Sequence, residues 1–575
     1  MTATTGPHHA PDARAGTSPA GDRGTGMKWW GWGLEDVAFT ADDKPDLRPF
    51  VREHLEVDIG QRARRPVGFD ELDIPEPTLP SPLRASLEGA VGAGAVSTDA
   101  HDRIVRHRGK SLRDIVLQRR GELGRLPDVV VWPADEDEVA AVMSAVLDAD
   151  AVVIPFGGGT SISGSVEAPA GESRPVVVAD LQRLDRVLEV DAHSRLARVQ
   201  AGVYGPDLER QLNARGFTFG HYPDSFTHST LGGWIATRSS GMQSDRYGDI
   251  GDLTRGLRVV TPNGRLAVRP VPSASNGPSV REMILGSEGR LGIITEATVH
   301  VRPLPAERLI LGYLFPDWSS GLAAMRDIAA SEASPSITRV SDAPETQFSF
   351  ATRKDPTLLD KVQSAALKAF LRRGKGFDIE QMCLSFIGYE GSESHVAEHR
   401  KLVKQIVARH GGLCVGRGPG ELYDQKKFDT PYIRDFLLDS GTIADVSETS
   451  APWSRLAEVH AATTAAAREA FTELGVLGYV MAHLSHSYHA GACLYFTFAI
   501  KPRTDMEPLD QYDRVKSAIQ QAFIDHGATL SHHHAVGTEH AEWLEQDISP
   551  AGAAMVRSLF DGVDTGHNLN PGKIV

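Results

Sequence analysis

Apolar and polar positions alternate in blocks between residues 128 and 156. The three valines and the tryptophan at 129–132 predict a buried strand, because a short apolar run rich in β-branched residues is typical of one. Residues 135–148 open with acidic side chains and predict a helix, and the apolar run at 152–156 predicts the next strand. Strand and helix alternation of this kind indicates a mixed α/β or α+β core.

Short strands continue along the chain to residue 301, and the pattern then changes. Further strands are predicted at 176–180, 187–190, 197–200, 257–261 and 292–301. After the proline-rich residues 302–305, longer helices at 320–331 and 396–410 are expected to alternate with strands at 309–315 and 383–389. This change of texture predicts a second domain beyond the first.

The composition is that of a globular chain with an acidic balance. Its 575 residues are 41% hydrophobic and carry a formal net charge of −15. An acidic chain opposes binding along a phosphate backbone, so no nucleic-acid partner is expected. The cysteines Cys383, Cys414 and Cys493 are far apart and odd in number, which favours a reducing compartment over a disulfide framework or a metal cluster.

The two ends of the chain and its apolar runs bear on targeting and on membrane insertion. Residues 1–26 lack the apolar core of a secretory signal and are expected to be disordered. No run of 18 apolar residues predicts a transmembrane helix, and the last three residues differ from the peroxisomal Ser-Lys-Leu. We therefore expect a cytoplasmic protein. The basic and apolar segment 368–377 leaves open peripheral contact with an anionic bilayer or a solvated helix end.

The strand at 152–156 runs into three glycines and two hydroxyl residues at 157–161. Consecutive glycines turn several backbone N–H groups to one side, where they can cradle a diphosphate. The loop lacks Gly-x-Gly-x-x-Gly and Gly-Lys-Ser/Thr, so the usual dinucleotide and triphosphate loops do not apply. Two more stretches of small and hydroxyl residues, 223–241 and 286–295, indicate close approach of backbone to a flat, polar ligand.

Three such loops in this order resemble the FAD-binding domain of the vanillyl-alcohol oxidase-type flavoproteins. The resemblance implies an α+β fold with a split FAD-binding domain, an α/β cap domain for substrate and a C-terminal segment that returns to the cofactor. It divides the chain into a disordered tail (1–26), an N-terminal helical region (27–121), the FAD-binding domain (122–304), the cap domain (305–528) and the C-terminal active-site segment (529–575). The residues placed at FAD are Pro155, Phe156, Gly157, Gly158, Gly159, Thr160, Ser161, Asp224, Ser225, Phe226, Thr227, His228, Ser229, Thr230, Thr237, Arg238, Ser239, Ser240, Glu288, Gly289, Arg290, Leu291, Gly292, Ile293 and Ile294.

Three consecutive histidines, His532, His533 and His534, form a cluster of titratable side chains. In an extended segment, alternate histidines would point to one side. The sequence leaves three roles open for them: binding of a phosphate or another part of the substrate, a metal site, and a structural role. Because no His-Glu-x-x-His or comparable pairing accompanies them, no metal ligand is assigned.

Residues 493–498 predict a strand that carries Tyr495. A strand tyrosine is by default a packing residue, and one that carries a proton needs its pKa of about 10 lowered by a nearby cation. Arg339 and Arg434 are the candidate cations, although an arginine is by default a surface or ion-paired residue.

Six stretches carry a closer resemblance, to the alkyldihydroxyacetonephosphate synthase family. They are residues 27–33, 221–225, 432–435, 448–453, 491–496 and 531–537. The resemblance implies a homodimeric transferase with non-covalent FAD, which acts on long-chain lipid substrates. In that family a fatty alcohol replaces the fatty acid of acyl-dihydroxyacetone phosphate without net oxidation, through an adduct at flavin N5, to give an ether lipid precursor.

The same resemblance implies a role for each candidate side chain. Tyr495 would take a proton from the carbon next to the substrate carbonyl, Arg434 would assist the departing carboxylate, and the histidines would hold the phosphate or support proton transfer. The catalytic residues implied are Tyr495, Arg434, His532, His533, His534 and Arg339. The substrate-binding residues implied are His221, Arg434, Ser447, His533 and His534.

Two alternative functions differ from this one in the residues that they require. An FAD-dependent 2-hydroxy acid dehydrogenase or oxidase shares the fold and the glycine-rich loop, but such enzymes resemble one another in a His-x-Gly-Asp-Gly-Asn metal-binding stretch. The corresponding residues 489–494 lack its acidic ligand. A flavin-binding or lipid-binding module without catalysis would be expected to lose Tyr495 or the arginines, and these are present.

Overall fold

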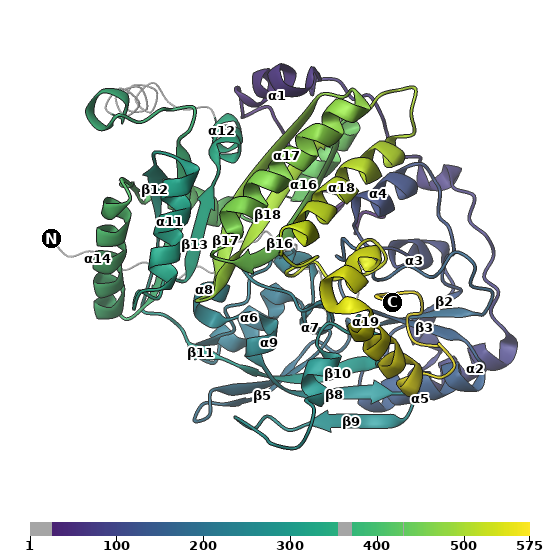
Figure 1. The fold of residues 1–575 in the computed structure, drawn as a ribbon. Helices are drawn as coiled ribbons and strands as arrows, with labels where there is room; N and C mark the ends of the chain where they lie inside the picture. The colour runs from purple at the N-terminus through teal and green to yellow at the C-terminus, as the bar shows by residue number, and fades with distance from the viewer. Residues whose placement is uncertain (1–25, 355–370, 429–430) are drawn as a thin grey trace.

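Two halves built on separate sheets make up the structure, a computed structural model that describes residues 26–354, 371–428 and 431–575 (Figure 1). One half contains a four-stranded and a five-stranded sheet, and we call it the two-sheet domain. The other half is built on a seven-stranded sheet, and we call it the cap domain.

The two-sheet domain opens with the order β1-β2-β4-β3, in which β2, β4 and β3 run parallel. These strands are buried on both faces, which explains their continuous valine runs. The antiparallel order β5-β6-β10-β8-β9 forms the second sheet. The strands are β1 (Val96–Ser97), β2 (Val129–Val131), β3 (Val152–Phe156), β4 (Val176–Asp180), β5 (Val187–Asp191), β6 (Leu196–Gln200), β8 (Thr254–Thr261), β9 (Gly264–Val268) and β10 (Ile293–His300). The helices are α5 (Glu136–Asp148), α6 (Gly205–Asn213), α7 (Leu231–Thr237), α8 (Ser244–Tyr247), α9 (Ile250–Leu253) and α10 (Val280–Ile284), and the pair β7 (Phe217–Thr218) and β11 (Arg302–Pro303) lies beside them.

The cap domain has the antiparallel order β15-β12-β14-β13-β17-β18-β16. The strands are β12 (Glu307–Phe315), β13 (Ile337–Ser341), β14 (Cys383–Gly391), β15 (Leu413–Gly416), β16 (Ile443–Pro452), β17 (Gly478–Ser487) and β18 (Gly491–Ile500). The helices are α11 (Trp318–Ala329), α12 (Ala343–Ala351), α14 (Glu393–Arg409), α15 (Gly418–Lys426), α16 (Pro431–Asp439), α17 (Leu456–Leu474) and α18 (Pro508–Asp525). Helices α17 and α18 cover one face of the sheet, where Phe496 and Phe498 of β18 lie in its core (Figure 1). Because side chains alternate along a strand, Tyr495 points to the opposite face.

Residues 27–121 are shared between the two halves. Helix α1 (Leu47–Leu55) joins an apolar cluster of the cap domain that includes Phe436 and Tyr479. Helix α2 (Ser81–Val91) packs instead against α5 of the two-sheet domain. The remaining helices of this stretch are α3 (Ala100–Val105) and α4 (Leu112–Arg119). The stretch therefore connects both halves.

The last residues return to the two-sheet domain, as the resemblance implied. After α19 (Leu544–Val563), the chain runs beside β3, where the N–H of Val153 donates to the carbonyl of Asn568 at 2.7 Å. The N–H of Asn570 donates back to the carbonyl of Val153 at 3.0 Å, and Leu569 between them is fully buried. The C-terminal segment thus extends the small sheet beyond β3.

The described part of the chain contains no helix long and apolar enough to cross a bilayer. In the basic segment 368–377, residues 368–370 lie outside the described residues. Leu371 and Phe377 are buried in an apolar cluster, whereas the two arginines between them are exposed. In the described part of this segment, the apolar side chains are therefore buried and the basic ones are exposed.

Replacement of Leu569 tests the role of the C-terminal return. Leu569→Ala should destabilise the two-sheet domain by about 2–5 kcal/mol, because it leaves a cavity in the core between β3 and α5. The matched change Leu477→Ala, at a leucine 43% exposed, should cost less than about 0.5 kcal/mol. Thermal unfolding followed by circular dichroism measures both, and equal melting temperatures for the two variants would contradict the prediction.

Candidate active site

A cavity of about 250 Å³ is lined by the loops of the two-sheet domain and by side chains of the cap domain. Most residues predicted to hold the cofactor line it. They are Pro155, Phe156, Gly157, Gly158, Gly159, Thr160, Ser161, Asp224, Ser225, Ser229, Thr230, Thr237, Ser239, Glu288, Gly289, Gly292 and Ile294. From the predicted catalytic set, Arg434, Tyr495, His533 and His534 reach the same space. The structure therefore brings the predicted loops and the predicted chemistry together.

The glycine loop after β3 fits tightly against the second loop. A Cβ atom on Gly158 would lie 1.8 Å from the backbone oxygen of His228, so only glycine fits there. Gly159 has φ +64°, a left-handed conformation that favours glycine. In the part of the chain that the structure describes, no N–H group of residues 157–161 donates a hydrogen bond to another protein group. Buried N–H groups need partners, so this loop is suited to bind an anion.

The third loop holds the C-terminal segment in place. The buried carboxylate of Glu288 accepts hydrogen bonds from the N–H groups of Val536, at 2.9 Å, and Gly537, at 3.0 Å. The side-chain amide of Asn570 donates to the carbonyl oxygens of Glu288 and Ser165, at 2.7 and 2.8 Å. Asn570 also lines the cavity. The end of the chain is thus part of the cavity wall.

The other residues predicted at the cofactor lie behind the cavity wall. They are Phe226, Thr227, His228, Arg238, Arg290, Leu291 and Ile293, whereas Ser240 lines a smaller adjoining space. Phe226 stacks on Trp234, while Leu291 and Ile293 belong to apolar cores. Arg238 pairs with Glu282 at 2.8 Å, and the guanidinium of Arg290 lies 4.8 Å from the ring centre of Phe560. These side chains point away because a loop or strand that contacts a ligand turns only some of its side chains toward it.

Tyr495 lies between two imidazole rings on the free face of the cap sheet. It is directly opposite Glu448 on β16 and opposite His483 on β17, so these three side chains share one face. The rings of His483 and Tyr495 are 4.9 Å apart with an interplanar angle of 19°. His533 stacks at 6.2 Å and His534 meets the Tyr495 ring edge-on at 5.5 Å. The tyrosine is therefore surrounded by groups that can exchange protons.

The electrostatic setting of Tyr495 differs from the expectation that a cation lowers its pKa. Burial raises the pKa of Tyr495 well above its ordinary value, and the nearby carboxylates of Asp224 and Asp445 raise it further. Arg339 opposes them only weakly, because its guanidinium donates to Glu345 at 2.8 Å and lies 3.2 Å from a ring nitrogen of His483. Tyr495 is accordingly a neutral phenol at rest.

The three histidines lie on a bent loop rather than on an extended segment. For this reason neighbours in sequence, His533 and His534, both contact Tyr495, and the expected alternation is not seen. His532 turns instead to Tyr488, whose hydroxyl is 2.6 Å from its Nε2. Burial lowers the pKa of each of the three histidines to about 4, so all three are neutral near pH 7.

Arg434 reaches the cavity from α16. Its closest carboxylate is that of Asp445 on β16, at 3.9 Å, and its buried Nε has no hydrogen-bond partner in the described chain. The next residue, Asp435, accepts the N–H of Trp32 at 2.7 Å. Trp32 lines the cavity as well. The N-terminal tryptophan segment thus positions α16, which brings Arg434 to the cavity.

Four residues predicted for catalysis or substrate binding do not line the large cavity: His532, Arg339, His221 and Ser447. Arg339 lines a smaller space of about 30 Å³ beside it, which Tyr495 and His533 also contact. His221 is buried against Trp234, and the hydroxyl of Ser447 is buried without a partner among the described residues. Their positions support the pocket from behind.

Several residues at the site were not predicted from the sequence. His483, Glu345, Asn570 and Trp32 are brought in by strand pairing and by the two chain ends. Glu448 falls within one of the six quoted stretches, but its type alone gave no reason to single it out. Only the pairing of β16 with β18 places it next to Tyr495.

Comparisons with known proteins agree with this geometry. Residues 127–268 match a family model described as FAD binding domain, and residues 304–574 match one described as FAD linked oxidases, C-terminal domain. The chain is 35% identical to alkyldihydroxyacetonephosphate synthase from Dictyostelium discoideum, over 96% of this chain and 93% of the relative. It is 32% identical to the Trypanosoma brucei brucei protein of the same name, over 96% and 92%.

The fold agrees as well as the sequence. A solved structure of alkyldihydroxyacetonephosphate synthase superposes with a TM-score of 0.82 at 33% identity, covering 96% of this chain and 98% of that one. Fold, FAD-binding loops and sequence identity point to the same relatives. The chain belongs to the alkyldihydroxyacetonephosphate synthase family.

Proposed function

We propose that this protein exchanges the acyl chain of acyl-dihydroxyacetone phosphate for a fatty alcohol, giving alkyl-dihydroxyacetone phosphate without net oxidation. The observation that carries the proposal is the single cavity that joins the anion-binding loop to Tyr495, Arg434 and two neutral histidines. Family membership supplies the reaction, since the relatives bear the name of this synthase. The site supplies the groups that the reaction needs.

The residues that line the cavity suit FAD. Some would bind its diphosphate, and others shape the wall of the cavity. The N–H groups of residues 157–161 have no hydrogen-bond acceptor in the described part of the chain and would hold the diphosphate of FAD, with Thr230 beside them. When bound, FAD supplies an electrophilic ring system that can hold the reacting carbon between departure of the acid and arrival of the alcohol. Gly158 lets the loop approach the second loop, and Asn570 closes the wall.

Proton transfer falls to Tyr495 and its neighbours. Because burial keeps the phenol neutral, Tyr495 can accept a proton from the substrate carbon only as its own hydroxyl proton leaves. The neutral imidazoles of His483 and His533, whose rings lie 4.9 and 6.2 Å from the ring of Tyr495, are the candidate acceptors. We assign Tyr495 the role of proton relay and the histidines the role of base.

Arg434 is placed to assist the departing carboxylate. Arg434 lines the cavity, and a guanidinium binds a carboxylate through two parallel hydrogen bonds. The bond between the substrate carbon and the carboxylate oxygen breaks, and a bond to the alcohol oxygen replaces it. The alcohol loses its hydroxyl proton, and the substrate carbon regains the proton that Tyr495 had accepted, so no electron acceptor is consumed. His532, His534 and Arg339 are assigned to the phosphate end, with His221 and Ser447 behind them.

Location and assembly follow from the substrates. Long acyl and alkyl chains are delivered from lipid surfaces, so we propose peripheral membrane contact, in which the exposed arginines after Leu371 would favour anionic lipid. We also propose that the protein is a cytoplasmic homodimer, as expected from the sequence and the family resemblance. The dehydrogenase alternative is less supported, because residues 489–494 lack the acidic ligand found in those enzymes.

The first prediction from the proposed function concerns the reaction itself. Anaerobic incubation of the flavin-loaded protein with palmitoyl-dihydroxyacetone phosphate and labelled hexadecanol should give labelled alkyl product and free palmitate, with the flavin oxidised at the end. No electron acceptor should be needed, since the exchange is redox-neutral. Bleaching of the flavin by lactate or glycolate, with no ether product, would favour the dehydrogenase instead.

The second prediction concerns Tyr495. Tyr495→Phe should keep the fold and the flavin, because the ring still packs between His483 and His533. Loss of the hydroxyl should lower kcat by ~10²–10⁴-fold, the range typical of a positioned proton-transfer group. The control is Tyr313→Phe, a buried tyrosine of β12 that bonds to Tyr389 at 2.9 Å and lies outside the cavity lining. Activity near that of the wild type in Tyr495→Phe would assign the relay to another residue.

The third prediction concerns the glycine loop. Gly158→Ala should reduce bound FAD at least about tenfold, because the new methyl collides with the backbone of His228 and pushes the loop out of place. The control Gly171→Ala has open space around its Cβ and should bind FAD normally. Flavin is measured in the supernatant after acid precipitation, which releases non-covalent FAD. Flavin that stays in the wild-type pellet would show covalent attachment.

A further inference from the structure

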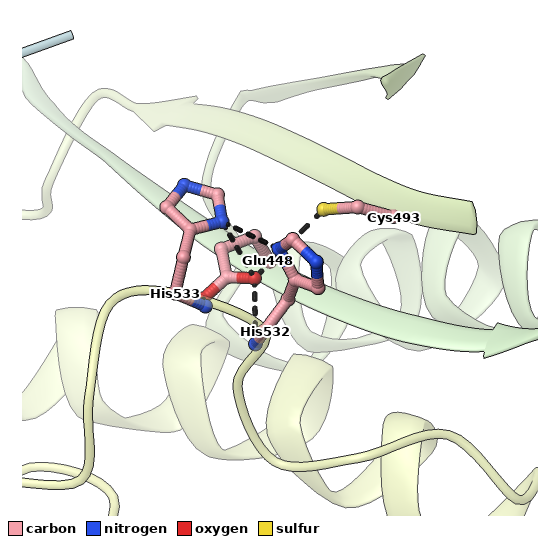
Figure 2. Close-up of side chains that lie close together, drawn as sticks. All are labelled: Glu448, Cys493, His532 and His533. Carbon is pink, nitrogen blue, oxygen red and sulfur yellow. Dashed lines mark hydrogen bonds and ion pairs between the residues drawn. The ribbon is translucent and has the colours of Figure 1, made fainter. Parts of the chain in front are cut away.

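The carboxylate of Glu448 is surrounded by hydrogen-bond donors from residues 531–537, which we call the histidine loop (Figure 2). Its Oε1 accepts from the Ser531 hydroxyl at 2.6 Å, from the N–H of His533 at 3.1 Å and from the N–H of His534 at 3.0 Å. Its Oε2 accepts the N–H of His532 at 2.8 Å. Successive backbone N–H groups that converge in this way form an anion-binding nest. Here the anion is a side chain of the protein itself.

Glu448 is held firmly from the side of the sheet as well. It is 2% exposed, and its backbone pairs with that of Tyr495 in the ladder between β16 and β18. Burial would raise its pKa, but the neighbouring histidines and the Ser531 hydroxyl more than offset this, so the pKa of Glu448 lies well below its ordinary value. The carboxylate stays ionised near pH 7. One rigid strand therefore fixes both Tyr495 and the anchor of the loop.

Glu448 also lies in a group of four side chains whose types could bind a metal ion. Ligand atoms of Glu448, Cys493, His532 and His533 all lie within 4.8 Å of one another (Figure 2). However, the carboxylate already accepts four short hydrogen bonds, and the thiol of Cys493 faces its Oε2 at 3.9 Å. Burial and the same carboxylate raise the pKa of Cys493 well above its ordinary value, so the thiol keeps its proton. Because N–H and O–H donors already occupy both carboxylate oxygens, the contacts favour an anchor over a ligand set.

The anchor determines where the imidazole rings point. The backbone N–H groups of His533 and His534 both donate to Oε1 of Glu448. With the backbone held in this way, the His533 ring stacks on Tyr495 and the His534 ring meets it edge-on. Ring nitrogens of these histidines also lie 3.4 and 3.6 Å from its oxygens. The ionised oxygens thus favour positive charge on the imidazoles at the moment when a proton arrives.

We propose that Glu448 is a positioning residue, whose carboxylate fixes the histidine loop against Tyr495 and stabilises the proton that the loop receives. The proposal rests on the proposed function for its catalytic part. Its structural part, the anchoring of residues 531–534, is independent of the reaction.

Glu448→Gln tests both parts. The amide has nearly the same size, but it offers one acceptor oxygen to a set of donors that now occupies two, and its NH₂ group would face another N–H. Hydrogen exchange of the peptide that contains residues 531–534 should become at least about tenfold faster, and kcat should fall about 10²-fold, as for a misplaced catalytic group. FAD content should stay at the wild-type level, and KM should change less than about threefold.

Glu390→Gln is the matched control. Glu390 is also a buried carboxylate of the cap sheet, and its oxygens accept from Gln243, Tyr247 and Arg308. Among the described residues, no hydrogen bond or ion pair joins it to the histidine loop. This variant should keep kcat within about threefold and should leave hydrogen exchange of residues 531–534 unchanged. Glu448→Asp keeps the charge on a shorter side chain and should recover part of the kcat lost in Glu448→Gln.

The outcomes separate the two proposals. Unchanged exchange at 531–534 in Glu448→Gln would overturn the anchor whatever the activity. Fast exchange with wild-type kcat would overturn the catalytic part, as would a loss of activity that merely follows loss of FAD. Stoichiometric metal in the wild type that disappears in Glu448→Gln would make the residue a ligand instead. If the wild type makes no alkyl product, the proposed function fails, while the exchange result still decides the anchor.

Discussion

The histidine loop is held between two buried carboxylates, and the rest of the site depends on this arrangement. Glu448 accepts the N–H groups of residues 532–534 from the cap domain, and Glu288 accepts those of Val536 and Gly537 from the two-sheet domain. Neither half of the molecule could position the loop alone. Because both carboxylates are buried, the loss of either would leave several buried donors without partners, which is costly.

This arrangement explains why the cavity is assembled from distant parts of the sequence. The anion-binding loop at 157–161 comes from the two-sheet domain, and Tyr495 comes from the cap sheet. Trp32 arrives from the N-terminal segment, and Asn570 from the C-terminal return. Two strand pairings set the remaining geometry: β3 with the chain end, and β18 with its neighbours on both sides. The distances between the side chains at the site therefore depend on the register of these strands.

Much of this could be predicted from the sequence, because the signals were local. Valine runs predicted the buried strands β2, β3 and β4, which the structure contains, and the freedom of the glycine backbone was enough to predict an anion site at residues 157–161. Tyr495 could be placed on a strand, but not opposite Glu448, since register depends on partners far away in the chain. The direction of its pKa shift was missed for the same reason: the carboxylates that raise it, Asp224 and Asp445, lie on other elements. The bend at His532 likewise follows from Glu448, a contact across 84 positions.

The unpaired N–H groups of residues 157–161 have a consequence for the life of the protein in the cell. Without FAD these donors must be hydrated or left unpaired, so the loop and the chain end that packs beside it are held less firmly. Binding adds stability in proportion to the logarithm of free cofactor concentration over the dissociation constant. Proteases act on the opened population, so the amount of this protein should follow flavin supply as closely as it follows synthesis of the chain.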